Sequence, residues 1–116
     1  MFHEDISFVT EYTGEVDDAT LGAELAEMIG DKSTVILANH GVIVTGADIR
    51  VATYRAASID RMCRLAYDVM NLGREPLPIA PGFMTGMKKS LLERGSDVYW
   101  AGAVRLLLKD EPDVLL

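Results

Sequence analysis

The spacing of hydrophobic and polar residues divides this chain into short strands and longer helices. Three short apolar runs predict β-strands, over Ile6–Val9, from Thr34 to about Ala38, and over Val42–Val44. Apolar positions that recur every three or four residues predict four helices: after Asp17 or Asp18 to about Ile29, from about Ala47 to Leu72, from Pro81 or Gly82 to about Glu93, and from Asp97 to about Leu108. This order of elements indicates an α/β fold with few strands, one long helix and C-terminal helices.

Residues that favour helix ends mark the expected boundaries. Gly30 is expected to end the first helix, and the stretch from Thr45 to Asp48 resembles a capping box with aspartate in place of glutamate. Gly95 is expected to close the third helix, and Ser96 to cap the last one. The pattern therefore predicts two separate helices in the C-terminal part of the chain.

The long central helix carries a stripe of small and apolar residues that we expect to be buried. Its members are Ala52, Arg55, Ala56, Ile59, Met62, Cys63, Ala66, Val69 and Met70. The place of Cys63 on this stripe favours a small core residue over a nucleophile. A buried Arg55 would need a carboxylate partner, and Asp60 is poorly placed for that role at five residues' distance.

A histidine interrupts the most apolar stretch of the chain. The run from Val35 to Val44 is apolar on both faces, which is typical of an inner strand, and Asn39-His40-Gly41 breaks it in the middle. An imidazole in this position must either find hydrogen-bond partners in the core or face a cleft and bind something. The residues alone leave both alternatives open for His40.

Composition and charge narrow the class of protein. The 116 residues suffice for one compact domain and are too few for two. The net charge of −7, without a basic stripe, argues against a nucleic-acid partner. The single cysteine excludes an internal disulfide and favours a cytoplasmic location. No apolar run approaches the length of roughly 18 residues that a membrane span needs, so we expect no membrane insertion.

Several segments taken together resemble the class II aldolase/adducin family. They are Gly30-Asp31-Lys32, the stretch from Leu37 to Gly46, Asp60-Arg61-Met62-Cys63 in the long helix, the stretch from Tyr99 to Leu107, and Glu111-Pro112. The resemblance implies an α/β/α sandwich, of which this chain would hold a part. It also implies a divalent metal, usually zinc, and the cleavage or isomerisation of sugar phosphates and related small oxygenated substrates. His40 matches the last metal-ligating histidine of the family.

The sequence departs from the family in the other metal ligands. Family members carry a His-x-His pair and a catalytic acidic residue upstream of the histidine that His40 matches. This sequence begins after them, so residues 1–116 look like the C-terminal half of a single family domain, truncated at its N-terminus. His3 is the only other histidine. His3 with Glu4 or Asp5 could complete a site at His40 if the N-terminus folded over the sheet, although an exposed histidine without a role is the simpler interpretation.

Two hypotheses for function follow. In the first, the chain belongs to the metal-dependent lyase and epimerase lineage, with His40 as a metal ligand, and is incomplete as an independent catalyst. In the second, it is a non-catalytic scaffold that associates with copies of itself or with a partner, because half a sandwich exposes sheet edges and apolar faces. The second hypothesis predicts a homo-oligomer.

Overall fold

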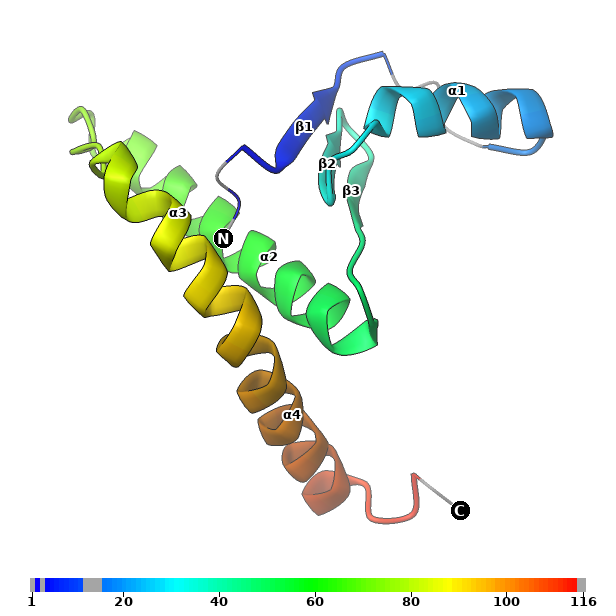
Figure 1. The fold of residues 1–116 in the computed structure, drawn as a ribbon, viewed down its shortest axis with the longest axis vertical. Helices are drawn as coiled ribbons and strands as arrows, with labels where there is room; N and C mark the ends of the chain where they lie inside the picture. The colour runs from blue at the N-terminus through cyan, green and yellow to red at the C-terminus, as the bar shows by residue number, and fades with distance from the viewer. Residues whose placement is uncertain (1, 3, 12–15, 115–116) are drawn as a thin grey trace. The chain divides into compact units, whose positions relative to one another are not determined.

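The computed structural model describes residues 2, 4–11 and 16–114, and the chain divides into two compact units. Residues 2–45 form a small sheet with one helix, and residues 46–116 form a helical unit. Figure 1 labels their elements along the chain. The mixed α/β class that the sequence predicts is confirmed. None of the helices in the described residues is long and apolar enough to span a membrane.

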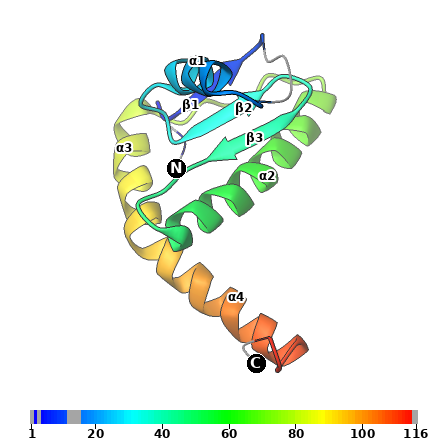
Figure 2. The same ribbon diagram turned by 90° about the vertical axis from the view of Figure 1, so that its right-hand side faces the viewer.

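The first unit is built on a three-stranded sheet in the order β1-β2-β3. Strands β1 (Ile6–Val9) and β2 (Thr34–Leu37) run parallel, and β3 (Gly41–Val44) returns antiparallel to β2 as a hairpin, as Figure 2 shows. Val35 and Leu37 of the central strand are buried with Val9, and Ile43 packs against them. The apolar run of β2 predicts an inner strand, and β2 is the central strand of the sheet.

Helix α1 (Ala19–Ile29) covers this small core with two of its apolar residues, Leu25 and Ile29. The Asp18 carboxylate accepts hydrogen bonds from the backbone N–H groups of Thr20 and Leu21 at 2.7 and 2.9 Å, which satisfies two donors that the first turn leaves unpaired. Gly30 ends the helix with a φ of 59°, where a side chain would be strained. Both predicted boundaries are confirmed.

The second unit begins with the long helix α2 (Ile49–Asn71). Asp48 is its N-cap and accepts a hydrogen bond from Val51 N at 3.0 Å. The expectation that Asp48 would occupy the third helical position of a capping box is therefore wrong, and the helix starts two residues later than about Ala47. Gly73 follows the helix with a φ of 63°, as its predicted end at Leu72 requires.

The C-terminal helices are continuous rather than separate, which corrects the sequence prediction. Helix α3 (Pro81–Ser90) passes through a π-helical turn, η1 (Leu91–Gly95), directly into α4 (Ser96–Asp110), as Figure 2 shows. Gly95 and Ser96 both have right-handed helical φ and ψ angles. The Ser96 hydroxyl donates to the carbonyl oxygen of Leu92 at 3.0 Å instead of capping a new helix. The extra residue of the π-turn is absorbed within the helix.

The burial of α2 also differs from the prediction. Ile59 is the only buried residue of this helix, and the predicted stripe residues Met62, Cys63 and Met70 are exposed. Cys63 is therefore not a core residue. The 3.6-residue period predicts a buried stripe along the whole helix, but it is mainly the first half that is packed.

Candidate functional site

The candidate site lies at the tip of the β2–β3 hairpin, where Ala38, Asn39 and His40 connect the strands. His40 N donates to the carbonyl oxygen of Leu37 at 3.2 Å and closes the turn, and Ala38 N donates to the Val9 carbonyl oxygen at 2.9 Å. Asn39 has a φ of 57°, the left-handed conformation that asparagine tolerates better than most residues. The short Asn-His-Gly sequence therefore forms the turn of the hairpin. It also fixes the backbone of His40 next to the sheet.

His40 is exposed to solvent. The alternative in which it is a core histidine, with both ring nitrogens bonded to buried backbone, is therefore wrong. The apolar residues on either side of the turn are in the sheet, whereas the turn itself lies at the end of the hairpin. The sequence correctly predicts where the strand is interrupted. It does not predict that His40 is exposed at this position.

The described residues do not complete a metal site around His40. No group of three or more histidine, cysteine, aspartate or glutamate side chains in residues 2, 4–11 and 16–114 lies close enough to hold a metal ion. A zinc ion with an open position for substrate needs about three protein ligands. The ligand set that this part of the chain offers therefore does not fit the metal that the family resemblance implies.

Glu4 and Asp5 lie far from His40, at the opposite end of the sheet. Asp5 accepts hydrogen bonds from the backbone N and the hydroxyl of Ser33 at 2.9 and 2.6 Å, just before β2 begins, whereas His40 follows the end of that strand. The four residues of β2 separate the two ends, which corresponds to about 13 Å. The structure therefore does not bring His40 together with these carboxylates, and His3 lies outside the described residues.

The Asp5 carboxylate instead anchors the sheet at this end. It ties the start of β1 to Ser33, and the Ser33 carbonyl oxygen in turn accepts from Thr45 N at 2.9 Å, after β3 has ended. The three strands are thus held together at one end by side-chain and backbone hydrogen bonds, and at the other end they carry the His40 turn.

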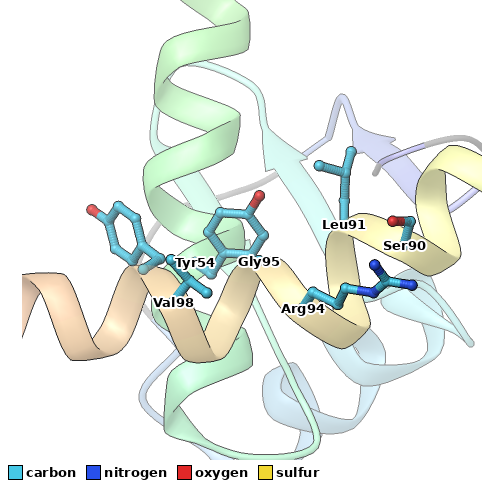
Figure 3. Close-up of a pocket in the computed structure, with 7 residues that line it drawn as sticks. Tyr54, Ser90, Leu91, Arg94, Gly95 and Val98 are labelled. Carbon is cyan, nitrogen blue, oxygen red and sulfur yellow. The ribbon is translucent and has the colours of Figure 1, made fainter.

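In the helical unit, a pair of tyrosines lines a shallow hollow beside the π-turn (Figure 3). Tyr54 of α2 lies against Gly95, and its ring centroid is 5.5 Å from that of Tyr99 on α4, at a tilt of 41°. Ser90 and Arg94 add polar groups at the rim. The sequence pattern does not predict this contact, because Tyr54 and Tyr99 belong to different helices. We assign the pair a packing role, in which it joins α2 to α4.

A charged cluster joins the same two helices at the start of α2. Arg50 donates to the Asp48 carboxylate from Nε and Nη2 at 3.2 and 2.7 Å, and its Nη1 lies 3.0 Å from the Asp97 carboxylate on α4. The hydrogen bond from Arg50, and then that from the Val51 N–H, lower the pKa of Asp48. The same carboxylate raises the pKa of Arg50. All three side chains are substantially solvated, so this cluster orients the helix ends rather than forming a buried reactive pair.

Comparison with known proteins assigns the family. The family described as "Class II Aldolase and Adducin N-terminal domain" matches residues 1–67. An aldolase II superfamily protein from Pseudomonas syringae has the same fold, with a TM-score of 0.76 and 21% identity, over 94% of this chain and 44% of that one.

A protein described as "4-hydroxy-3-prenylphenylpyruvate oxygenase/4-hydroxy-3-prenylbenzoate synthase", from Streptomyces roseochromogenus subsp. oscitans, is 28% identical over 89 residues. The match covers 75% of this chain and 32% of that protein. The chain thus spans about a third of the length of this relative. The family match extends over more than half of the residues and includes the strands and the His40 turn, and the chain therefore belongs to the class II aldolase and adducin family.

Proposed function

We propose that this chain contributes His40 as one ligand of a divalent-metal site of the class II aldolase type, and that it is not a complete catalyst by itself. The observation that carries the proposal is the position of His40. Its imidazole is exposed at the tip of a hairpin whose backbone is fixed by the Leu37 hydrogen bond and the Asn39 conformation. A solvent-exposed histidine on a backbone held by hydrogen bonds is suited to metal ligation.

The remaining ligands would come from polypeptide beyond residues 1–116. The support for this step is that the described residues offer one suitably placed imidazole, whereas a catalytic zinc requires roughly three protein ligands. Zinc is the metal that we propose for the completed site. The reaction class that the lineage favours is retro-aldol cleavage, epimerisation or decarboxylation of a small oxygenated or sugar-phosphate substrate.

The role of His40 can be tested on the chain itself by NMR. The histidine ring resonances are followed during titration with Zn²⁺, in the wild type and in two matched variants, His40→Ala and His3→Ala. We expect the His40 resonances to shift and to saturate only at a large excess of metal, because one imidazole binds weakly. We also expect His3→Ala to retain this response and His40→Ala to lose it. If His3→Ala abolishes the response while His40→Ala retains it, the assignment of His40 is wrong.

We also propose that the chain self-associates, which is the property that a non-catalytic scaffold would need. Strands β1 and β3 each lie at an edge of the three-stranded sheet in the described residues, and an unpaired edge favours association. The helical unit exposes large apolar side chains, among them Leu77, Phe83 and Val98. Light scattering at micromolar concentration checks this proposal: we expect a mass above that of the monomer, and a monodisperse monomer would contradict it.

An exposed single thiol at Cys63 supports a reducing, cytoplasmic setting.

A further inference from the structure

The two halves of helix α2 differ sharply in exposure. Between Val51 and Ile59, only Ala56 is exposed, whereas every residue from Asp60 to Asp68 is exposed. The first half packs against α4, and Tyr54 lies against Gly95. A helix segment in which every residue is exposed, as from Asp60 to Asp68, would be expected to be polar throughout. This one is not.

The uncovered half carries an apolar seam at the spacing of a helix–helix interface. Met62, Leu65, Val69 and Leu72 follow one another at intervals of three, four and three residues, which is the pattern of the two core positions in a heptad repeat. The exposed fractions of Met62, Leu65 and Leu72 are 46%, 52% and 71%, and Val69 is half-buried. Covering these side chains would remove a substantial apolar surface from water.

Two side chains of opposite charge flank this seam on one side. Arg61 and Asp68 are seven residues apart, so they lie two helical turns apart on the same face. Within the described part of the chain neither takes part in an ion pair, in contrast to Arg64, whose Nε lies 3.0 Å from the Asp60 carboxylate. The flanking charges are therefore available to a partner.

The order of these charges is self-complementary for one orientation only. When two copies of α2 lie antiparallel about a two-fold axis close to Leu65, Arg61 of each copy lies opposite Asp68 of the other. In this register Met62 of each copy lies beside Leu65 of the other, so the two ion pairs form together with an apolar contact at the axis. In a parallel pair, Arg61 would instead lie level with Arg61 of the other copy, and Asp68 with Asp68 of the other copy. Flanking charges of this kind set the orientation of paired helices.

We propose that the α2 seam, defined as Met62, Leu65, Val69 and Leu72 with Arg61 and Asp68 beside it, pairs antiparallel with α2 of a second copy of this chain. Met62, Leu65 and the two charged residues of each copy form the contact at the two-fold axis. The inference deepens the proposed self-association by naming its surface, and it does not depend on the metal-site proposal.

Charge reversal tests the pairing. Arg61→Asp and Asp68→Arg each place like charges together twice in the dimer, whereas the double variant with both changes restores the attraction with its sign exchanged. Sedimentation equilibrium gives the dimer Kd for each variant, and circular dichroism checks that helix content is unchanged. We expect each single variant to raise Kd by at least about tenfold and the double variant to return it to within about threefold of the wild-type value. Arg105→Asp, the same charge change at an exposed position of α4, is the matched control and should leave Kd unchanged.

The possible results distinguish two claims: that the chain self-associates, and that it does so through the α2 seam. A wild-type protein that stays monomeric at high micromolar concentration overturns both. An oligomer whose Kd is unaffected by the single reversals overturns the α2 seam and leaves self-association standing. Weakening by both single variants without recovery in the double variant overturns the antiparallel pairing of Arg61 with Asp68.

Discussion

Gly95 lies directly against the phenol ring of Tyr54: a β-carbon at position 95 would be 2.6 Å from the Tyr54 hydroxyl oxygen and 2.7 Å from two ring carbons. Distances this short require the ring or the helix to move. The glycine therefore permits the close approach of α2 and α4, and the π-turn that ends at Gly95 places it there.

This contact predicts opposite effects for two glycine-to-alanine changes in the same continuous helix. Alanine favours a helix over glycine by about 1 kcal/mol. At Gly102, where a β-carbon would meet nothing within 4 Å, we expect Gly102→Ala to stabilise the protein by up to about that amount. At Gly95, we expect Gly95→Ala to destabilise it by about 1–3 kcal/mol, because the added methyl overpacks the ring contact. Urea unfolding of both variants measures the difference, and equal stabilisation by both changes would show that the contact is absent.

The N-cap of α2 predicts a dependence of stability on acid pH. The hydrogen bond from Arg50 lowers the pKa of Asp48 below its ordinary value of 3.8. A carboxyl whose pKa is lower in the folded state adds stability above its unfolded pKa and loses that contribution as the pH falls through the folded value. We expect wild-type protein to melt at a higher temperature than Asp48→Asn at neutral pH, and the gap to close below about pH 4.

The matched change for this test is Asp31→Asn, because Asp31 is exposed and is not the N-cap of a helix. Melting temperatures measured from pH 7 to pH 2.5 should show a much smaller gap for this control. A gap for Asp48→Asn that persists undiminished into acid would exclude the carboxylate charge as its source.

The buried hydroxyl of Thr34 leads to a prediction that one substitution in the sheet is stabilising. Its side chain is fully buried, and its hydroxyl oxygen has no hydrogen-bond partner among the described residues. An unpaired buried hydroxyl costs free energy, and valine has nearly the same shape without the polar atom. We expect Thr34→Val to raise the free energy of unfolding by about 1 kcal/mol. Thr85→Val, at an exposed position of α3, is the comparison and should change it far less; a loss of stability at Thr34 would reveal a hydrogen bond to this hydroxyl.

The His40 turn predicts a strong dependence on residue type at Asn39. A β-branched residue at a φ of 57° is strained, whereas glycine is not. We expect Asn39→Val to lower the free energy of unfolding by about 1–3 kcal/mol and Asn39→Gly to change it little. Chemical denaturation gives both values. Equal stability of the two variants would mean that the hairpin tolerates another turn geometry, in which case the position of His40 is not fixed by Asn39.

The sequence predicted local structure well where one residue type settles the outcome. Asp18 caps α1 and Gly30 ends it, and the strand over Ile6–Val9 appears with the same limits. These features depend on a single side chain or a single φ angle. Gly95 and Ser96 were interpreted by the same logic and gave a helix break that does not exist. Tertiary packing decided this case, because the Tyr54 ring needs a glycine beside it and the Ser96 hydroxyl finds a carbonyl one turn back.

The periodicity of α2 shows a second limit of sequence interpretation. A stripe of apolar residues identifies the face that a helix would bury, but it does not say whether the covering surface belongs to the same chain. Ile59 is covered, and Met62 on the continuing stripe is not. The exposure of His40 was unpredictable for a related reason, since the residues of a hairpin tip and of an inner strand can have similar neighbours in sequence.

The most direct test of the central claim is the metal content of the purified chain. The claim is that the described residues, 2, 4–11 and 16–114, present one suitable imidazole, His40, and do not hold a catalytic metal by themselves. The protein is produced in zinc-supplemented medium and purified without chelators, and its zinc, manganese and iron are measured by mass spectrometry beside His40→Ala. We expect less than about one tenth of an equivalent of each metal in both proteins, since a stable zinc site needs about three ligands. A full equivalent in the wild type that is lost in His40→Ala would contradict the claim and show a complete site within this chain.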